Sequence, residues 1–189
     1  IRELTASEAP YLREALYNAI HVRPGDSPPH RDILNEELFR RIYVGWGRPG
    51  DIAVVAESRE SAHPAAVAED SRAERLVGVA DRRIPSVVGA AWVRLHTADA
   101  PVYGYVDPAT PVLAISLEPG YRGRGLGTAM LRRLFKAVRT AGYSSISLSA
   151  DPLNPAIRLY ERLGFQAVLE PPIIPGDKSP RMRLRLVES

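Results

Sequence analysis

Residues 117–128 read Leu117-Glu118-Pro119-Gly120-Tyr121-Arg122-Gly123-Arg124-Gly125-Leu126-Gly127-Thr128, and they join an apolar, strand-like run to an amphipathic, helix-like run. Glycine has no Cβ, so its backbone adopts positive φ values and can come close to a ligand. The first N–H groups of a helix have no partner within that helix, and they point at any anion bound there. Two arginines add positive charge to the turn. The stretch therefore predicts a phosphate-binding turn at the start of a helix.

Three phosphate-binding motifs compete for this turn, and their spacing separates them. A P-loop has Lys followed by Ser or Thr directly after its last glycine, whereas Gly127 is followed here by Thr-Ala. A dinucleotide-binding fingerprint has an acidic residue about 20 residues further on, and residues 144–147 at that place are all uncharged. The third motif, (Gln/Arg)-x-x-Gly-x-(Gly/Ala), is matched by residues 122–127.

A second motif follows in the stretch Asn154-Pro155-Ala156-Ile157-Arg158-Leu159-Tyr160-Glu161-Arg162-Leu163-Gly164-Phe165. Together and in this order, the two motifs resemble the two signatures of the GNAT superfamily, the acetyl-CoA-dependent N-acyltransferases. The resemblance covers roughly residues 88–187, and the N-terminal part matches only in its pattern of elements.

Local sequence rules agree with this resemblance. Asn154 is a favourable N-cap, Pro155 suits the first helical position and Gly164 suits the left-handed position after a helix, so a helix is predicted over about 155–163. The helix after the glycine turn is predicted from an apolar stripe at helical spacing. That stripe comprises Leu126, Met130, Leu131, Leu134, Phe135 and Val138.

The rest of the chain is predicted to alternate strands and helices. Strands are expected at 1–4, 52–56, 77–81, 87–95, 111–117, 144–149, 166–169 and from Arg181, and further helices at about 5–20 and around 34–42. A capping box, Thr5-x-x-Glu8, opens the first of these helices. Residues 57–75 are polar and rich in Ala, Ser and Glu, and are interpreted as a mobile hairpin insertion within a single domain spanning 1–189.

The resemblance implies an α/β (α+β) fold, with a mixed, mostly antiparallel sheet of six to seven strands flanked by about four helices. Strands 111–117 and 144–149 are its expected parallel neighbours, and they should diverge to form the cofactor cleft. Pantetheine would insert between them like an additional strand. The residues that the resemblance implies for binding acetyl-CoA, as acyl-donor cosubstrate, are Leu117, Pro119, Arg122, Gly123, Arg124, Gly125, Leu126, Gly127, Thr128, Asn154 and Tyr160.

The implied reaction is direct attack of a neutral primary amine on acetyl-CoA, and three residues are candidates for catalysis. The N–H of Leu117 is the candidate donor to the oxyanion. Glu118 is the candidate base, with a water on Ser116 and a purely solvated Glu118 as alternatives. Tyr160 is the candidate donor to the departing thiolate, and a core tyrosine is the alternative. A non-catalytic acetyl-CoA sensor is the alternative function.

The acceptor is predicted to be a small molecule, peptide or protein amine, bound by the first helices and by the loop before the last strand. The candidate acceptor-binding residues are 22–32, Glu36, Glu37, Tyr43, Trp46, Tyr103, Tyr105, Asp107 and 171–180. The acidic and aromatic residues among them suit a cationic amine.

Composition bears on membrane association, metal binding and the kinds of partner that the protein can have. The chain has 189 residues, 45% of them hydrophobic, and no apolar run near the ~20 residues of a membrane span. It has no cysteine, and its four histidines lack ligand spacing, so no metal is expected. Arg181, Arg183 and Arg185 alternate with apolar residues and are interpreted as an edge strand protected by its charges. A cytoplasmic enzyme is expected, with no nucleic-acid or membrane partner and with homodimerisation left open.

Overall fold

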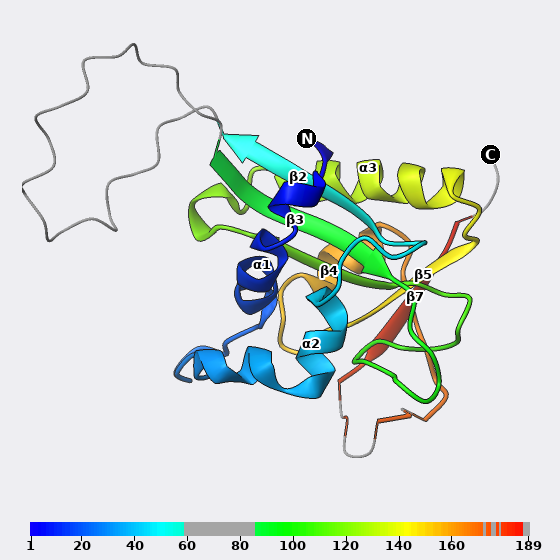
Figure 1. Cartoon of the computed structure of the whole chain (residues 1–189). Coiled ribbons are helices and arrows are strands. Elements are labelled where there is room, and N and C mark those ends of the chain that lie inside the picture. Colours follow the sequence, from blue (N-terminus) through cyan, green and yellow to red (C-terminus); the bar gives the residue numbers. More distant parts are fainter. Residues whose placement is uncertain (59–85, 172, 175–176, 178, 187–189) are drawn as a thin grey trace, which may run out of the picture.

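The computed structural model describes residues 1–58, 86–171, 173–174, 177 and 179–186. Its centre is a sheet of seven strands in the order β1-β2-β3-β4-β5-β7-β6 (Figure 1). The strands are β1 (Arg2–Glu3), β2 (Ile52–Ser58), β3 (Ser86–Arg94), β4 (Val112–Leu117), β5 (Ser145–Ser149), β6 (Gln166–Ala167) and β7 (Arg181–Arg185). Only β4 and β5 run parallel among the described neighbours. The predicted mixed, mostly antiparallel sheet is confirmed.

Helices cover both faces of this sheet. The elements are α1 (Tyr11–Ala19), α2 (Glu37–Tyr43), α3 (Leu126–Thr140) and α4 (Ile157–Arg162), with short 3-10 helices η1 (Ala6–Glu8), η2 (Arg31–Asn35) and η3 (Pro119–Tyr121). α1 and α2 lie on one face and α3 on the other (Figure 1). None of these described helices is long and apolar enough to cross a membrane.

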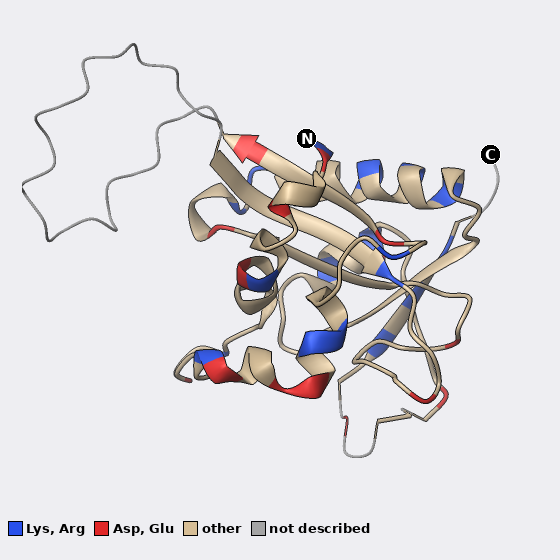
Figure 2. Cartoon of the chain, viewed as in Figure 1, with Lys and Arg blue, Asp and Glu red and all other residues tan. Residues whose placement is uncertain are grey.

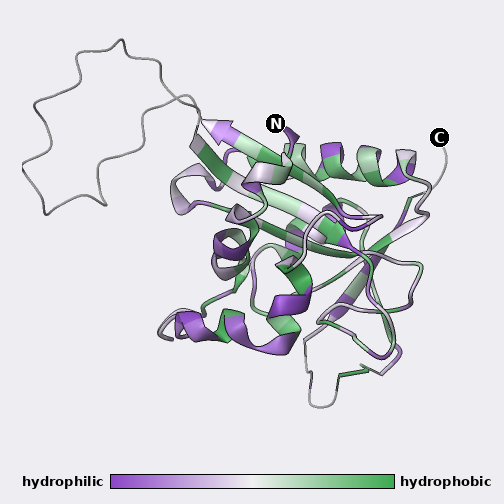
Figure 3. Ribbon diagram, in the orientation of Figure 1, coloured by the Kyte–Doolittle hydropathy of each residue, from purple (hydrophilic) through white to green (hydrophobic). Residues whose placement is uncertain are grey.

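The sheet separates two apolar cores, because successive side chains of a strand point to opposite faces. On β3, Val93 belongs to the core under α3 and α4, whereas Trp92 belongs to the core under α1 and α2. The central strands therefore contribute apolar residues to both cores, and green, hydrophobic segments run along them in Figure 3. The predicted stripe of α3 is confirmed, and its fully buried members are Met130, Leu131, Leu134, Phe135 and Val138. Every charged residue of α3 is Lys or Arg (Figure 2).

The N-terminal helices differ from their predictions. The capping box is present, since Oε2 of Glu8 accepts the N–H of Thr5 at 2.9 Å, but it opens only the short η1. Pro10 follows and is the N-cap of α1, because proline has no N–H to continue a helical ladder. The next predicted helix is likewise divided into η2 and α2, because Glu36 between them is extended, with ψ 144°.

β2 is longer than predicted, so the predicted insertion after it begins later in the sequence. β2 extends to Ser58, so Glu57 and Ser58 pair with β3 and do not belong to a loop. The rest of the predicted insertion, at 59–75, and the strand predicted at 77–81 lie outside the described residues.

β4 and β5 pair only at the start of β4, opposite the middle of β5. Their register contains one pair, Val112 with Ser147, and the N–H of Ser147 donates to Pro111 O at 3.0 Å. In contrast, β4 keeps six register pairs with β3 along its whole length. The predicted divergence of two parallel neighbours is therefore present, and it opens the sheet beyond Val112.

The last strand is not an edge strand, which corrects the sequence interpretation. β7 lies between β5 and β6, and the short β6 forms the edge. Arg181 is buried and donates to the carbonyls of Tyr105 and Pro171 at 3.0 Å each. Arg183 pairs with Asp107. These arginines fix neighbouring loops and do not form a free charged face.

A buried ion pair holds the turn after α2 against the sheet. Arg94 ends β3 and Asp51 precedes β2; their side chains are 2% exposed each, and Nη2 lies 2.7 Å from Oδ2. The guanidinium also donates to the carbonyls of Arg41, Val44 and Gly45. The N–H groups of the guanidinium thus have acceptors within the protein, as a buried charge requires.

We expect Asp51→Asn to lower the free energy of unfolding by about 3 kcal/mol or more, because it leaves the Arg94 charge buried without its counter-ion. Urea unfolding measures the change. The matched control is Glu14→Gln, which neutralises the exposed pair between Glu14 and Arg31 and should cost far less. Equal losses in the two variants would contradict the role given to the buried pair.

Candidate functional site

The glycine turn forms an open, basic site at the start of α3. Gly123 and Gly125 have φ values of 74° and 79°, the left-handed region that favours glycine. A Cβ built at either position would meet no described atom within 4 Å. Gly125 is the N-cap, and the first N–H to bond back into the helix is that of Ala129, at 3.1 Å from Gly125 O. The preceding N–H groups are thus available to an anion.

The end of β4 orients backbone groups toward the opening. Glu118 N–H donates to Val88 O on β3 at 2.9 Å. Because successive N–H groups of a strand point to opposite edges, those of Ile115 and Leu117 point away from β3 toward β5. Arg122, which is exposed, donates from Nε to Leu117 O at 2.8 Å. Arg122 of the glycine turn is therefore hydrogen-bonded to the carbonyl of Leu117 in this structure.

A cavity of about 280 Å³ lies where β4 and β5 separate. Its wall includes Ile115 of β4 and Leu148 of β5, Leu16 of α1, and Asn154 and Tyr160 from the α4 region. Residues from both faces of the sheet thus meet in one space, which a continuously paired sheet would prevent. The divergence of the two strands is what allows this contact.

Tyr160 lies at this cavity with its hydroxyl group free. The side chain is 8% exposed, and its ring meets Phe165 edge to face at a centroid distance of 5.7 Å. Its hydroxyl makes no hydrogen bond with any residue that the structure describes. Burial raises the pKa of Tyr160 to about 12. The group is therefore a neutral hydroxyl donor across the physiological range.

Asn154 and Gly164 fix the helix that carries Tyr160. The Oδ1 of Asn154 accepts the N–H of Ala156 at 2.9 Å, so it caps the turn that leads into α4, which begins two residues later than predicted. Gly164 has a φ of 94° as expected. The N–H groups of Gly164 and Phe165 donate to Glu161 O and Tyr160 O at 2.9 and 3.0 Å, which is the bonding pattern of a Schellman motif.

Glu118 is not brought together with Tyr160. Its side chain is exposed, and neither it nor Leu117 is among the described residues that line the cavity. Glu118 lies instead near Tyr11 of α1, whose pKa is raised to about 12, mainly by burial and then by the charges of Glu118 and Glu14. Ser116 is buried within the sheet.

The predicted acceptor residues divide into two groups. Tyr103, and Ser179 of the predicted 171–180 segment, line the cavity. Others support the fold: the Tyr43 hydroxyl donates to Leu34 O at 3.0 Å, and Trp46 stacks on Arg94 with 5.3 Å from the guanidinium carbon to the ring centre.

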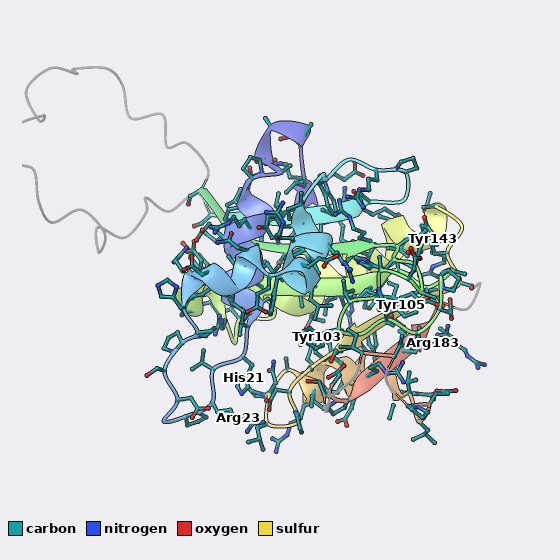
Figure 4. The ribbon with its side chains drawn as sticks, turned by 60° about the horizontal axis from the view of Figure 1, so that its bottom comes forward. His21, Arg23, Tyr103, Tyr105, Tyr143 and Arg183 are labelled. Carbon is teal, nitrogen blue, oxygen red and sulfur yellow. The ribbon has the colours of Figure 1, made fainter. Side chains whose placement is uncertain are left out.

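Sequence reasoning missed two histidines of the cavity wall, His21 and His96. His21 follows α1 and lies on the same side of the molecule as Tyr103 (Figure 4). Burial, and then the charges of Arg94 and Arg48, lower the pKa of His96 to about 4. Their positions were the available signal, since each histidine lies two residues beyond the end of an element that packs against β4.

Comparison with known proteins gives consistent matches. The family model for the acetyltransferase (GNAT) family matches residues 31–165. Mycothiol acetyltransferase of Corynebacterium aurimucosum is 29% identical over 136 residues, which are 71% of this chain and 36% of that protein. Mycothiol acetyltransferase of Thermobispora bispora is 34% identical over 84 residues, or 44% of this chain and 28% of that protein. The chain thus spans about a third of the length of these curated relatives.

Solved structures share the fold. An acetyltransferase of the GNAT family from Staphylococcus aureus has a TM-score of 0.57 at 14% identity, covering 98% of this chain and 97% of that one. A GNAT superfamily phosphinothricin acetyltransferase from Sinorhizobium meliloti, solved in complex with acetyl-CoA, has a TM-score of 0.54 at 17% identity, covering 97% and 86%. With both motifs, the diverging strands and the family match over most of its length, the chain belongs to the GNAT acetyltransferase family.

Proposed function

We propose that this protein transfers the acetyl group of acetyl-CoA to a primary amine by direct attack in a ternary complex. The observation that carries the proposal is the cavity at the β4–β5 divergence, whose wall includes Tyr160, a residue with no hydroxyl partner among the described residues. Family membership supports the reaction class. The names of the curated relatives make a mycothiol-type amine one candidate acceptor.

The glycine turn is the proposed site for the diphosphate of CoA. The free N–H groups at the start of α3, with Arg122 and Arg124 beside them, suit its negative charge. Pantetheine would then run along the unpaired edge of β4, bonding to backbone groups that β5 leaves free. In this arrangement Arg122 exchanges its bond to Leu117 O for the diphosphate, which frees that carbonyl for pantetheine.

One backbone N–H of β4 is proposed to stabilise the oxyanion. Leu117 is the sequence-based candidate. Ile115 has the same orientation and lines the cavity with Tyr160, so it is the alternative; two residues apart on a strand, about 6.6 Å, the two N–H groups do not reach the same oxygen. A preorganised N–H directed at the developing charge lowers the barrier, because its orientation is fixed before the reaction.

Tyr160 is proposed to act as a hydrogen-bond donor to the departing thiolate. Its pKa of about 12 exceeds that of a thiol, ~8.5, so complete proton transfer costs about 4.8 kcal/mol. A hydrogen bond without full transfer avoids this cost. A sensor that only bound acetyl-CoA would have no use for a free hydroxyl at this position, so Tyr160 favours the enzyme over the sensor.

The acceptor amine must also lose a proton for the reaction to proceed. An alkyl ammonium with a pKa of ~10.4 gives up its proton at pH 7 at a cost of about 4.6 kcal/mol. Glu118 stays the predicted base from the sequence, although its exposed position separates it from the cavity.

We expect Gly125→Val to weaken acetyl-CoA binding about 10- to 100-fold, since its side chain obstructs one or two charge-assisted hydrogen bonds to the diphosphate. Titration calorimetry measures the affinity. The matched control is Gly142→Val at the other end of α3, where φ is 90° and no described atom lies within 4 Å of an added Cβ. Both variants carry similar backbone strain, about 1–2 kcal/mol. Equal affinities in the two would refute the proposed diphosphate site.

Tyr160→Phe should reduce turnover by roughly 10- to 1000-fold, the scale of one catalytic hydrogen bond. Acetyl-CoA affinity and thermal stability should change little, because the ring still packs on Phe165 and no protein partner among the described residues loses a hydrogen bond. Single-turnover thiol release with an amine panel measures the chemical step. Reduced stability with unchanged turnover would make Tyr160 a core residue only.

A further inference from the structure

We propose that His21 accepts the proton of the attacking amine, from the α1 side of the sheet, while Tyr160 serves the leaving thiolate from the α4 side. This inference rests on the proposed acetyl transfer and names a second residue for the same site. Its starting observation is a buried polar atom without a partner among the described residues.

The Nε2 atom of His21 is buried and has no hydrogen-bond partner among the described residues. His21 also lines the cavity at the β4–β5 divergence. An unpaired buried polar atom costs about 1–3 kcal/mol, and most such atoms in folded proteins are paired. A ligand that enters the cavity and bonds to Nε2 would remove this cost. The reacting amine is such a ligand, because it approaches the thioester through the same space.

Surrounding contacts fix the segment that carries His21. Ile20 is the C-cap of α1, and its N–H donates to Tyr17 O at 3.2 Å. Two residues beyond His21, Arg23 bonds Oδ2 of Asp151 at 2.8 and 3.0 Å. Asp151 follows β5 and also lines the cavity. This ion pair therefore ties the end of α1 to the end of β5, on either side of the opening.

The other titratable groups facing this space are less suited to take the proton. Asp151 is occupied by Arg23 and by the N–H of Leu153, and these contacts lower its pKa. His96 lies beside Arg94 and Arg48, and with a pKa of about 4 it is a weak base. The phenols of Tyr103 and Tyr160 also border the cavity, and a neutral phenol donates a proton more readily than it accepts one. His21 is the remaining candidate.

In the proposed acetyl transfer, the proton of the amine and the leaving thiolate are received by different groups. The amine lone pair forms the C–N bond, and the carbonyl electron pair moves onto oxygen, where a backbone N–H of β4 stabilises it. Bond formation makes the nitrogen more acidic, and Nε2 of His21 takes its proton. The oxyanion then reforms the carbonyl, the C–S bond breaks, and its electron pair leaves on sulfur, which accepts the hydrogen bond of Tyr160. His21 returns its proton to solvent.

The test is the pH dependence of kcat/KM for the amine in His21→Gln, which keeps a polar side chain but cannot take up a proton. Thiol release from acetyl-CoA is followed over a panel of primary amines. We expect about a 100-fold loss near pH 7. The loss should shrink at low pH, along the acidic limb of the parent profile, because a His21 that already carries a proton cannot accept that of the amine. Acetyl-CoA affinity and the thermal midpoint should stay at parent values.

Three further variants make the result specific. Lys136→Gln, on the exposed face of α3, should match the parent throughout. Glu118→Gln and His96→Gln should keep the acidic limb of the parent profile. Loss of that limb in either one, with His21→Gln unchanged, would overturn the assignment, as would a His21→Gln loss that does not vary with pH. A parent protein that binds acetyl-CoA but acetylates no amine would instead refute the proposed function itself.

Discussion

The separation of β4 from β5 after one register pair is the constraint on which the site depends. A parallel pair that stayed hydrogen-bonded would satisfy the N–H groups of Ile115 and Leu117 and would keep the two apolar cores apart. Where pairing stops, backbone donors are left free and side chains from both faces share one cavity. An extended ligand can replace the missing strand partner, so the proposed binding mode follows from the sheet's geometry.

The opening needs support, because an interrupted sheet loses hydrogen bonds that would otherwise hold its halves together. β3 and β4 stay paired along six positions and provide a rigid wall. On the face covered by α1 and α2, the buried pair of Arg94 and Asp51 anchors the turn after α2, and the Arg23–Asp151 pair links the segment after α1 to the segment after β5. Charged side chains thus hold the loops, while the cavity wall between them is largely apolar.

Local signals were sufficient for the parts of the fold that one segment determines. The glycine turn, the buried stripe of α3 and the left-handed Gly164 follow from spacing and backbone preference, and the resemblance supplied the parallel pair and its divergence. The break at Pro10 was available from the same local rules, although the capping box at Thr5 suggested a continuous helix. The place of β7 inside the sheet depends on pairing between distant segments, which strand alternation does not encode.

The site was predictable to a smaller extent, for the same reason. Tyr160 was predicted because it belongs to a motif, and the structure places it at the cavity. The unpaired Nε2 of His21, which has no partner among the described residues, depends on α1, β4 and the loop after β5 meeting in space. Glu118 was chosen for its place next to Leu117 in the sequence, and strand alternation turns its side chain toward α1 and away from the cavity. Adjacent residues on a strand face opposite sides, so neighbours in sequence are not neighbours in the site.

Amide hydrogen exchange at β4 tests the central claim most directly. If acetyl-CoA takes the place of the missing strand partner, its binding should slow exchange at Ile115 and Leu117, whose N–H groups face the opening. Leu113 should change little, because the β4–β5 register already pairs its neighbour Val112 with Ser147. Unchanged exchange at Ile115 and Leu117 in a protein saturated with acetyl-CoA would contradict the account.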